Sequence, residues 1–425
     1  MDADTVRAWV TGLQDLDRTL DDPARIDLIR ALEELKCAAE GAQAVTTADF
    51  DASQRAVQAA RGVPAARQGQ GIAAQVALAR RESPHRGQQH LQLATLLPRE
   101  LPHTRTALVG GHITEHKAML IARESACLTL EDRLKIDQRV AADPDHLGSL
   151  GDRALIAEIH RHAYRLDPHS VVERRRRAEH ERRVTLRPAP DVMTHLSALL
   201  PVKQGVAVLA VLGREADRLR AAGDERSRGQ IMADTLVRRV LTSVDAGGGR
   251  EPAVMVNLVV SDEVLWGGSN EAAHLDGYGP IPGDLARELA AGDQVWLRRL
   301  YASPATGSLV AMDSRARRVP AGMRTLIRLR DQTCRTPWCD APIRHGDHVR
   351  SAADEGPTSE VNTQGLCEAC NYAKQAAGWS ARPRPGPRHT TVTTTPTGHT
   401  YDSTAPPVTT PHYVPAGPGR WTLVA

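Results

Sequence analysis

Four of the six cysteines in this 425-residue chain fall within one short window near its C-terminal end. Their spacing is C-x4-C and then, after 27 residues, C-x2-C. Two such pairs supply the four thiolates of a tetrahedral zinc site, and joining their turns closes the intervening segment into a stabilised loop. We therefore predict one structural Zn²⁺; the alternative is four buried cysteines that pack as small apolar side chains. The predicted zinc ligands are Cys334, Cys339, Cys367 and Cys370.

Polar residues of a second kind lie inside and just after this cysteine window: Asp347, His348, Asn362, Asn371 and Lys374. Carboxylate and amide oxygens suit Mg²⁺ or Mn²⁺ better than a second zinc. A histidine beside them can accept a proton from water near neutral pH. This set predicts a hydrolytic site for a phosphodiester. A lone histidine is more often a hydrogen-bonded surface group, and residues 347 and 348 of a strand point to opposite faces, so a local bend is expected.

The stretch "GDHVRSAADEGPTSEVNTQGLCEACNYAK" (346–374) resembles the HNH endonucleases, in the branch that also binds zinc. The resemblance implies a ββα-metal domain with one divalent ion, in which His348 is the general base. It implies that Asp347 and Asn371 hold the catalytic Mg²⁺ or Mn²⁺. Asn362 would hold the loop between the strands and orient the base. Many members have His where this chain has Asn371, and the Gly-Gly often seen before the central Asn is replaced by "EGP" (355–357).

The whole chain is similar to actinobacterial HNH proteins with a long N-terminal domain of unknown function. This wider resemblance extends over roughly 75–300 and into the tail.

Basic segments flank the acidic cysteine window. Six arginines and no acid occupy 315–330, and three arginines and no acid occupy 381–388. Such a frame suits a polyanion, whereas the alternative is a solvated helix face beside a basic tail. The candidate DNA contacts are Arg324, Arg328, Arg330, Arg350 and Lys374.

Two functions follow from these features. The first is a metal-dependent DNA endonuclease of HNH type, a phosphodiester hydrolase in which His348 and Asn362 form the catalytic pair. The alternative is a non-catalytic, zinc-stabilised nucleic-acid-binding protein whose helical domain binds a partner. The discriminating feature is the complete set of Asp347, His348, Asn362 and Asn371, which a pure binder has no reason to keep.

The elements that must position these residues indicate an α+β multidomain protein. Helical periodicity dominates 1–165, including a helix, Gly-Gly turn and helix at 101–124. Residues 166–300 are expected to be α+β, with a hairpin after residue 182, helices at 202–222 and 229–244, a strand at 253–261 and a loop at 267–284. These two regions together form the N-terminal domain, 310–380 the nuclease domain, and 381–425 a Pro/Thr/Arg-rich tail with at most short hairpin strands.

Composition limits the remaining possibilities. One Phe and 3% aromatic residues mean that Leu, Val, Ala and Ile must build the cores. Cys37 and Cys127 are expected in such cores, and His103, His112 and His116 at the surface. The start of the chain lacks a signal-peptide layout and no apolar run could span a membrane, so we expect a cytoplasmic protein. The expected partner is DNA, and the N-terminal helical region is a candidate surface for a homodimer or a protein partner.

Overall fold

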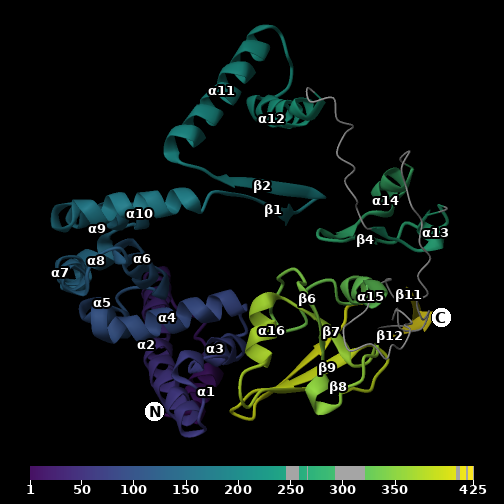
Figure 1. The fold of residues 1–425 in the computed structure, drawn as a ribbon. Coiled ribbons are helices and arrows are strands. Elements are labelled where there is room, and N and C mark those ends of the chain that lie inside the picture. Colours follow the sequence, from purple (N-terminus) through teal and green to yellow (C-terminus); the bar gives the residue numbers. More distant parts are fainter. Residues whose placement is uncertain (246–257, 266, 292–320, 408–411, 418–419, 425) are drawn as a thin grey trace. The chain divides into compact units, whose positions relative to one another are not determined.

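The computed structural model describes residues 1–245, 258–265, 267–291, 321–407, 412–417 and 420–424 (Figure 1). The chain forms two compact units. The first comprises Met1–Val76 and His85–Val172, and the second comprises Ala77–Pro84 and Glu173–Ala425. Mixed helix and sheet confirms the expected α+β class. The expected domain bounds stay predictions.

The first unit is helical. Thr114 and Thr129 precede two of its helices and accept hydrogen bonds from Lys117 N–H and Asp132 N–H, which satisfies donors that a helix start leaves unpaired. The helices of this region are α1 (Ala3–Gly12), α2 (Asp22–Ala60), α3 (Ile72–Arg80), α4 (Pro84–Glu100), α5 (Pro102–Val109), α6 (Glu115–Ser125), α7 (Leu130–Ala141), α8 (Pro144–Ser149), α9 (Asp152–Leu166) and α10 (Pro168–His180), with a short 3₁₀ helix at Ala65–Arg67.

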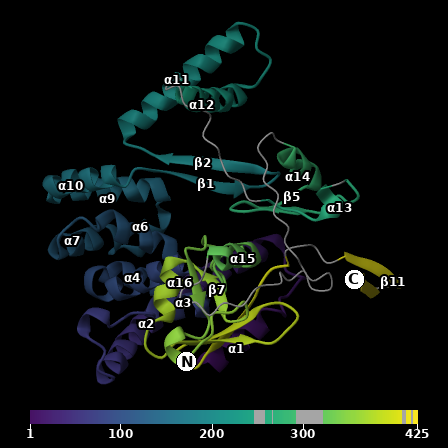
Figure 2. The ribbon, with the colours of Figure 1, turned by 45° about the vertical axis from the view of Figure 1, so that its right-hand side comes forward.

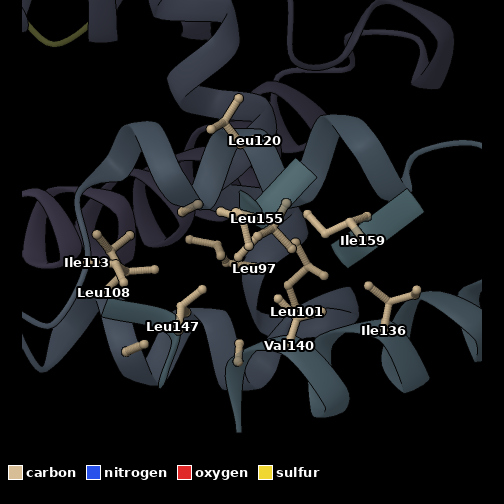
Figure 3. Close-up of a cluster of buried hydrophobic side chains, with 14 of the residues drawn as sticks. Leu97, Leu101, Leu108, Ile113, Leu120, Ile136, Val140, Leu147, Leu155 and Ile159 are labelled. Atoms are coloured by element: carbon tan, nitrogen blue, oxygen red, sulfur yellow. The ribbon is translucent and has the colours of Figure 1, made fainter. Parts of the chain in front are cut away.

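Aliphatic side chains build the core of this unit, as the scarcity of aromatic residues predicts. Figure 3 shows Leu97, Leu101, Leu155 and Ile159 meeting inside the cluster. Each of these side chains is at most 2% exposed. Close packing of branched side chains from several helices therefore replaces the larger area that aromatic rings would bury.

The predicted helix, Gly-Gly turn and helix at 101–124 is confirmed as α5 and α6. Gly111 in the turn has φ +80°, a backbone conformation that favours glycine. Gly41 lets α2 approach α5, because a Cβ atom there would lie 2.7 Å from the Val109 Cα.

Cys37 is buried, and Cys127 packs at the edge of the core. The three histidines expected at the surface are exposed: His103, His112 and His116.

The middle region contains the expected hairpin and helix pair. Strands β1 (Arg183–Ala189) and β2 (Met193–Leu199) pair antiparallel in a regular register, and α11 (Val202–Ala221) packs on α12 (Arg228–Asp245) (Figure 2). The loop expected at 267–284 instead contains two short strands, since its Gly-rich turn joins residues that pair. The remaining elements are β3 (Leu258–Val259), α13 (Asp262–Leu265), β4 (Ala273–Leu275), β5 (Gly279–Ile281) and α14 (Gly283–Ala290). The first part of the strand expected at 253–261 lies outside the described residues.

The C-terminal part places a small hairpin and a helix around the cysteines. Its elements are α15 (Ala321–Asp331), β6 (His345–His348), a 3₁₀ turn at Ala352–Asp354, β7 (Thr363–Leu366), α16 (Glu368–Lys374), β8 (Ser380–Arg384), β9 (Thr390–Thr394), β10 (Thr400–Thr404), β11 (His412–Gly417) and β12 (Arg420–Val424). Strands β6 and β7 pair antiparallel, and β9 lies between β8 and β10 in a second sheet.

The segment predicted as a separate tail is partly integrated into this C-terminal part. The Arg335 side chain donates to the backbone carbonyls of His389 and Ser403, so the second sheet is tied to the cysteine region. Its core positions include the buried residues Thr391 and Val392. The short hairpin strands expected in the tail are present as β8, β9 and β10, and these contacts attach their sheet to the cysteine region.

None of the helices in the described parts of the chain is long and apolar enough to cross a membrane.

Candidate metal and hydrolytic site

Four buried thiols form one cluster, as the cysteine spacing predicts. The Sγ atoms of Cys334, Cys339, Cys367 and Cys370 all lie within 4.8 Å of one another. A tetrahedral zinc with bonds of about 2.3 Å separates its sulfur ligands by about 3.8 Å. The Cys339 and Cys367 sulfurs are 3.8 Å apart. The cluster can therefore hold a metal ion such as zinc with little movement.

Short backbone turns present these thiols to one another. Cys339 N–H donates to the Thr336 carbonyl, and Cys367 caps α16 while its sulfur accepts from Cys370 N–H. Hydrogen bonds with the thiols of Cys334, Cys339 and Cys370 lower the pKa of the Cys367 thiol. Hydrogen bonds with the thiols of Cys334, Cys339 and Cys367, together with burial, raise the pKa of Cys370. A bound cation would stabilise the ionised form of all four thiols, so this buried cluster could hold a metal ion.

Strand β6 carries Asp347 and His348 to the end of the hairpin. Its pairing with β7 is regular, with Asp347 opposite Gln364 and His348 opposite Thr363. The expected bend is absent from this pairing, so the two side chains leave opposite faces of the strand. The His348 Nε2 lies 2.8 Å from the hydroxyl oxygen of buried Thr358, in the loop that joins β6 to β7.

The side chain of Asn362 holds that loop together through three hydrogen bonds. Its Oδ1 accepts from Arg350 N–H at 2.9 Å, and its Nδ2 donates to the carbonyls of Arg350 and Pro357 at 3.0 and 2.8 Å. The side chain is 3% exposed. These contacts fix the loop that contains Thr358, so Asn362 reaches the imidazole of His348 only through the loop.

Helix α16 turns one face toward β6. Lys374 donates from Nζ to Asp347 Oδ2 at 2.5 Å and to the His348 carbonyl. Asn371 lies three residues earlier and therefore on the same helix face. Its amide Oδ1 is buried and has no hydrogen-bond partner within the described residues. A buried polar atom without a partner is costly, which marks this oxygen as a candidate ligand.

The predicted DNA-contacting arginines divide by environment. Arg324 is exposed on α15. Arg328 is also exposed and pairs with Asp276 at 2.7 Å. The Arg350 guanidinium donates to the carbonyls of Asp354 and Glu355 and closes the loop.

Arg330 corrects the prediction, because its side chain is buried and 2% exposed. Its guanidinium donates to both carboxylate oxygens of Asp331 at 2.8 and 3.0 Å, and to the carbonyls of Glu360 and Thr363. Every arm of this guanidinium therefore has an internal partner, and Arg330 cannot reach a phosphate.

Sequence reasoning missed three residues that organise the site. Asp331 is fully buried and accepts from Gly365 N–H on β7 at 2.7 Å. Burial lowers the pKa of His389 to about 4, and its Nε2 lies 3.0 Å from the Val361 carbonyl. Thr358 holds the imidazole of His348. Residue type and local spacing carried no signal for Thr358, whose partner lies across a loop, or for His389, whose partner lies 28 positions away.

Comparisons with known proteins place the larger part of the chain in a family. A family model for a domain of unknown function, DUF222, matches residues 29–331. The "Uncharacterized protein Rv3776" of Mycobacterium tuberculosis (strain ATCC 25618 / H37Rv) is 33% identical over 132 residues, 31% of this chain. The aligned part spans 24% of that protein's length. No solved structure matches the chain. The family match ends before Cys334, and because it covers more than half of the 425 residues, the chain belongs to the DUF222 family.

Proposed function

We propose that the C-terminal part of this chain is a metal-dependent DNA endonuclease of HNH type whose fold is stabilised by one Zn²⁺ in the four-cysteine cluster. The observation that carries the proposal is the buried Asn371 oxygen without a hydrogen-bond partner in the described parts of the chain. It lies one helical turn from Lys374, which contacts Asp347. A carboxylate and an amide oxygen are the protein ligands that a Mg²⁺ or Mn²⁺ ion would use here, with water and a phosphate completing its shell.

A divalent ion held by Asp347 and Asn371 would supply positive charge to the phosphodiester oxygens. The Lys374 ammonium on Asp347 would keep this carboxylate oriented. His348 would accept the proton of the attacking water. For Nδ1 to be the accepting atom, Nε2–H must donate to the Thr358 hydroxyl, so this hydrogen bond would select the tautomer. Asn362 would act as a positioning residue, because its contacts hold the loop.

The region of α15 would provide part of the contact with DNA through Arg324 and Arg328, which are exposed. Arg350 would support the loop as well as meet the phosphate backbone. The first part of the basic segment at 315–330 lies outside the described residues.

Cleavage of a supercoiled plasmid tests the proposal. We expect nicking with Mg²⁺ or Mn²⁺ and none with EDTA. His348→Ala should lower the rate by about 10²–10⁴-fold, the usual contribution of a general base. His345→Ala is the matched control, because His345 lies on the same strand and outside the proposed set. An unchanged rate in folded His348→Ala would exclude this histidine as the base.

A second candidate function is supported by the ion pair of Lys374 with Asp347. An internal ammonium in contact with this carboxylate could replace the divalent ion, leaving a zinc-stabilised domain that binds nucleic acid without cutting it. DNA binding that falls with added salt, together with no cleavage in either metal, would favour this candidate.

A further inference from the structure

The β1–β2 hairpin is exposed over nearly its whole length. All residues of β2 are exposed, and only the last residue of β1 is partly covered. Figure 2 shows the hairpin as a two-stranded ribbon. Such a ribbon is at best marginally stable in water without further strands or a covering layer. Its residue pattern indicates what kind of surface would cover it.

One face of the hairpin is apolar. Directly opposed residues share a face, and the register pairs Val184 with Ala198 and Leu186 with Leu196. Val184, Leu186 and Leu196 are 65%, 63% and 57% exposed. The opposite face is mostly polar: Thr185 lies opposite Ser197, an arginine lies opposite His195, and a second arginine lies opposite Leu199, with Met193 as the other large apolar residue. This alternation is typical of a sheet that is buried on one side and solvated on the other.

The two edges of the hairpin differ. Strand β1 contains Arg183, Arg187 and Pro188, and charges and proline protect an edge against pairing. The sequence of β2, "MTHLSAL", contains no Pro, Lys, Arg, Asp or Glu. Among the described residues β2 pairs only with β1, so its outer edge is the side on which another strand can add.

The helix that follows β2 adds an apolar stripe of its own. Val202, Val206 and Leu209 are spaced by four and three residues and share one face of α11. They are 81%, 62% and 62% exposed. The hairpin and the start of α11 thus expose apolar side chains over one continuous stretch of sequence.

We propose that a second copy of this chain covers this surface, with β2 pairing antiparallel to β2 of its partner. A two-fold axis perpendicular to the sheet makes the contact isologous and keeps both apolar faces on the same side. The result is a four-stranded sheet in the order β1–β2–β2–β1. The apolar stripes of the two α11 helices supply the layer that covers its face.

Charge and area both favour a second copy. The arginines of β1 lie on the outer strands of the four-stranded sheet, so the central seam between the two β2 strands joins uncharged edges. A typical stable interface takes about 800 Å² from each partner. Six Val and Leu side chains on the apolar faces of the hairpin and of α11 are each more than half exposed and contribute on the order of 300–450 Å²: Val184, Leu186, Leu196, Val202, Val206 and Leu209. The backbone and polar side chains of β2 add to this area.

A mutant pair tests the apolar face. Light scattering over a dilution series should give wild-type protein a mass twice the 46.1 kDa of the chain. Leu196→Arg should shift the population toward monomer. His195→Arg introduces the same charge at the neighbouring position on the polar face and should remain dimeric. A monomeric wild type, or equal behaviour of the two variants, overturns the proposal.

Single-cysteine variants test the strand pairing independently of stability. A residue on the two-fold axis faces its own copy at a Cα separation of about 4.5–5.5 Å, which a disulfide can span. Mild oxidation should therefore cross-link one of His195→Cys, Leu196→Cys and Ser197→Cys. Thr185→Cys lies opposite Ser197 on the outer strand, so it should not cross-link above the wild-type background. Equal cross-linking of Thr185→Cys and all three β2 variants, or none in any of them, overturns the β2 seam.

Discussion

Replacing Arg330 with alanine should unfold the support of the candidate site and not simply remove a DNA contact. Arg330 pairs with its neighbour Asp331 at the end of α15, and it ties this helix to the carbonyls of Glu360 and Thr363, just before and at the start of β7. Asp331 in turn holds Gly365 N–H in that strand. The substitution therefore removes the cation that balances a fully buried carboxylate and leaves two carbonyls without this donor.

The magnitude follows from burial. The side chains of Arg330 and Asp331 are 2% and 0% exposed, so solvent cannot replace the lost partner. The next cation, Arg335, has its Nε 4.0 Å from Asp331 Oδ1. Removing one member of a buried pair typically costs about 3–5 kcal/mol. Arg328→Ala is the matched control from the same helix, because its 55% exposed side chain forms a surface pair worth only about 0.2–1 kcal/mol.

Hydrogen–deuterium exchange on the full chain measures this locally. Amides of β7 and α16 in Arg330→Ala should exchange roughly 10²–10⁴-fold faster, the equivalent of 3–5 kcal/mol at about 1.4 kcal/mol per factor of ten. In Arg328→Ala their exchange should change by less than about tenfold. Unchanged exchange in Arg330→Ala, combined with weaker DNA binding, would refute the buried role and restore the surface role.

Two further predictions concern the metal and pH. Elemental analysis should find one zinc per chain in the wild type and none in Cys367→Ser. Cys127→Ser should keep the zinc, because Cys127 packs beside the helical core; zinc-free, folded wild type would contradict this. His389 is held neutral with a pKa of about 4, below the unfolded value of about 6.5. The unfolded chain therefore binds the extra proton between these values, and stability should fall as pH drops from about 6.5 to 4. In His389→Gln the unfolding midpoint should depend less on pH between about 4 and 6.5 than it does in the wild type. The same pH dependence in both proteins would contradict this prediction.

The cysteine cluster could be predicted because its information is local. Two pairs with short internal spacing place thiols on two turns, and a metal needs only those turns to meet. The helical first unit was similarly readable, since apolar periodicity determines which face of a helix is buried. The aliphatic core follows from composition, because a chain with one Phe and 3% aromatic residues must fill its cores with aliphatic side chains.

The role of Arg330 had a sequence signal that counting charges overlooks. Met323, Ile327 and Arg330 are spaced by four and three residues, so Arg330 continues the buried stripe of α15. Arg324 and Arg328 each lie one position further along and face outward. A basic helix is therefore better interpreted by its periodicity than by its net charge.

Contacts between distant segments could not be read from one sequence. The Arg335 side chain meets the Ser403 carbonyl, which lies 68 positions later, and His389, just before β9, meets the Val361 carbonyl 28 positions earlier. Such pairings depend on which sheet closes on which loop, and no periodic pattern encodes that choice. Short hairpin strands were expected in the tail, but the attachment of their sheet to the cysteine region was not.

The regular strand at Asp347 and His348 constrains how a hydrolytic site could work. Lys374 contacts the Asp347 carboxylate but only the backbone carbonyl of His348, whereas the imidazole meets Thr358 in the clamped loop. His348 is the last residue of β6, so the loop and not the strand sets the direction of its ring. In the proposed reaction α16 would fix the residues that hold the divalent ion, and the loop would fix the imidazole of His348. Asn362 is the residue whose hydrogen bonds hold this loop, and through it the His348 imidazole, in place.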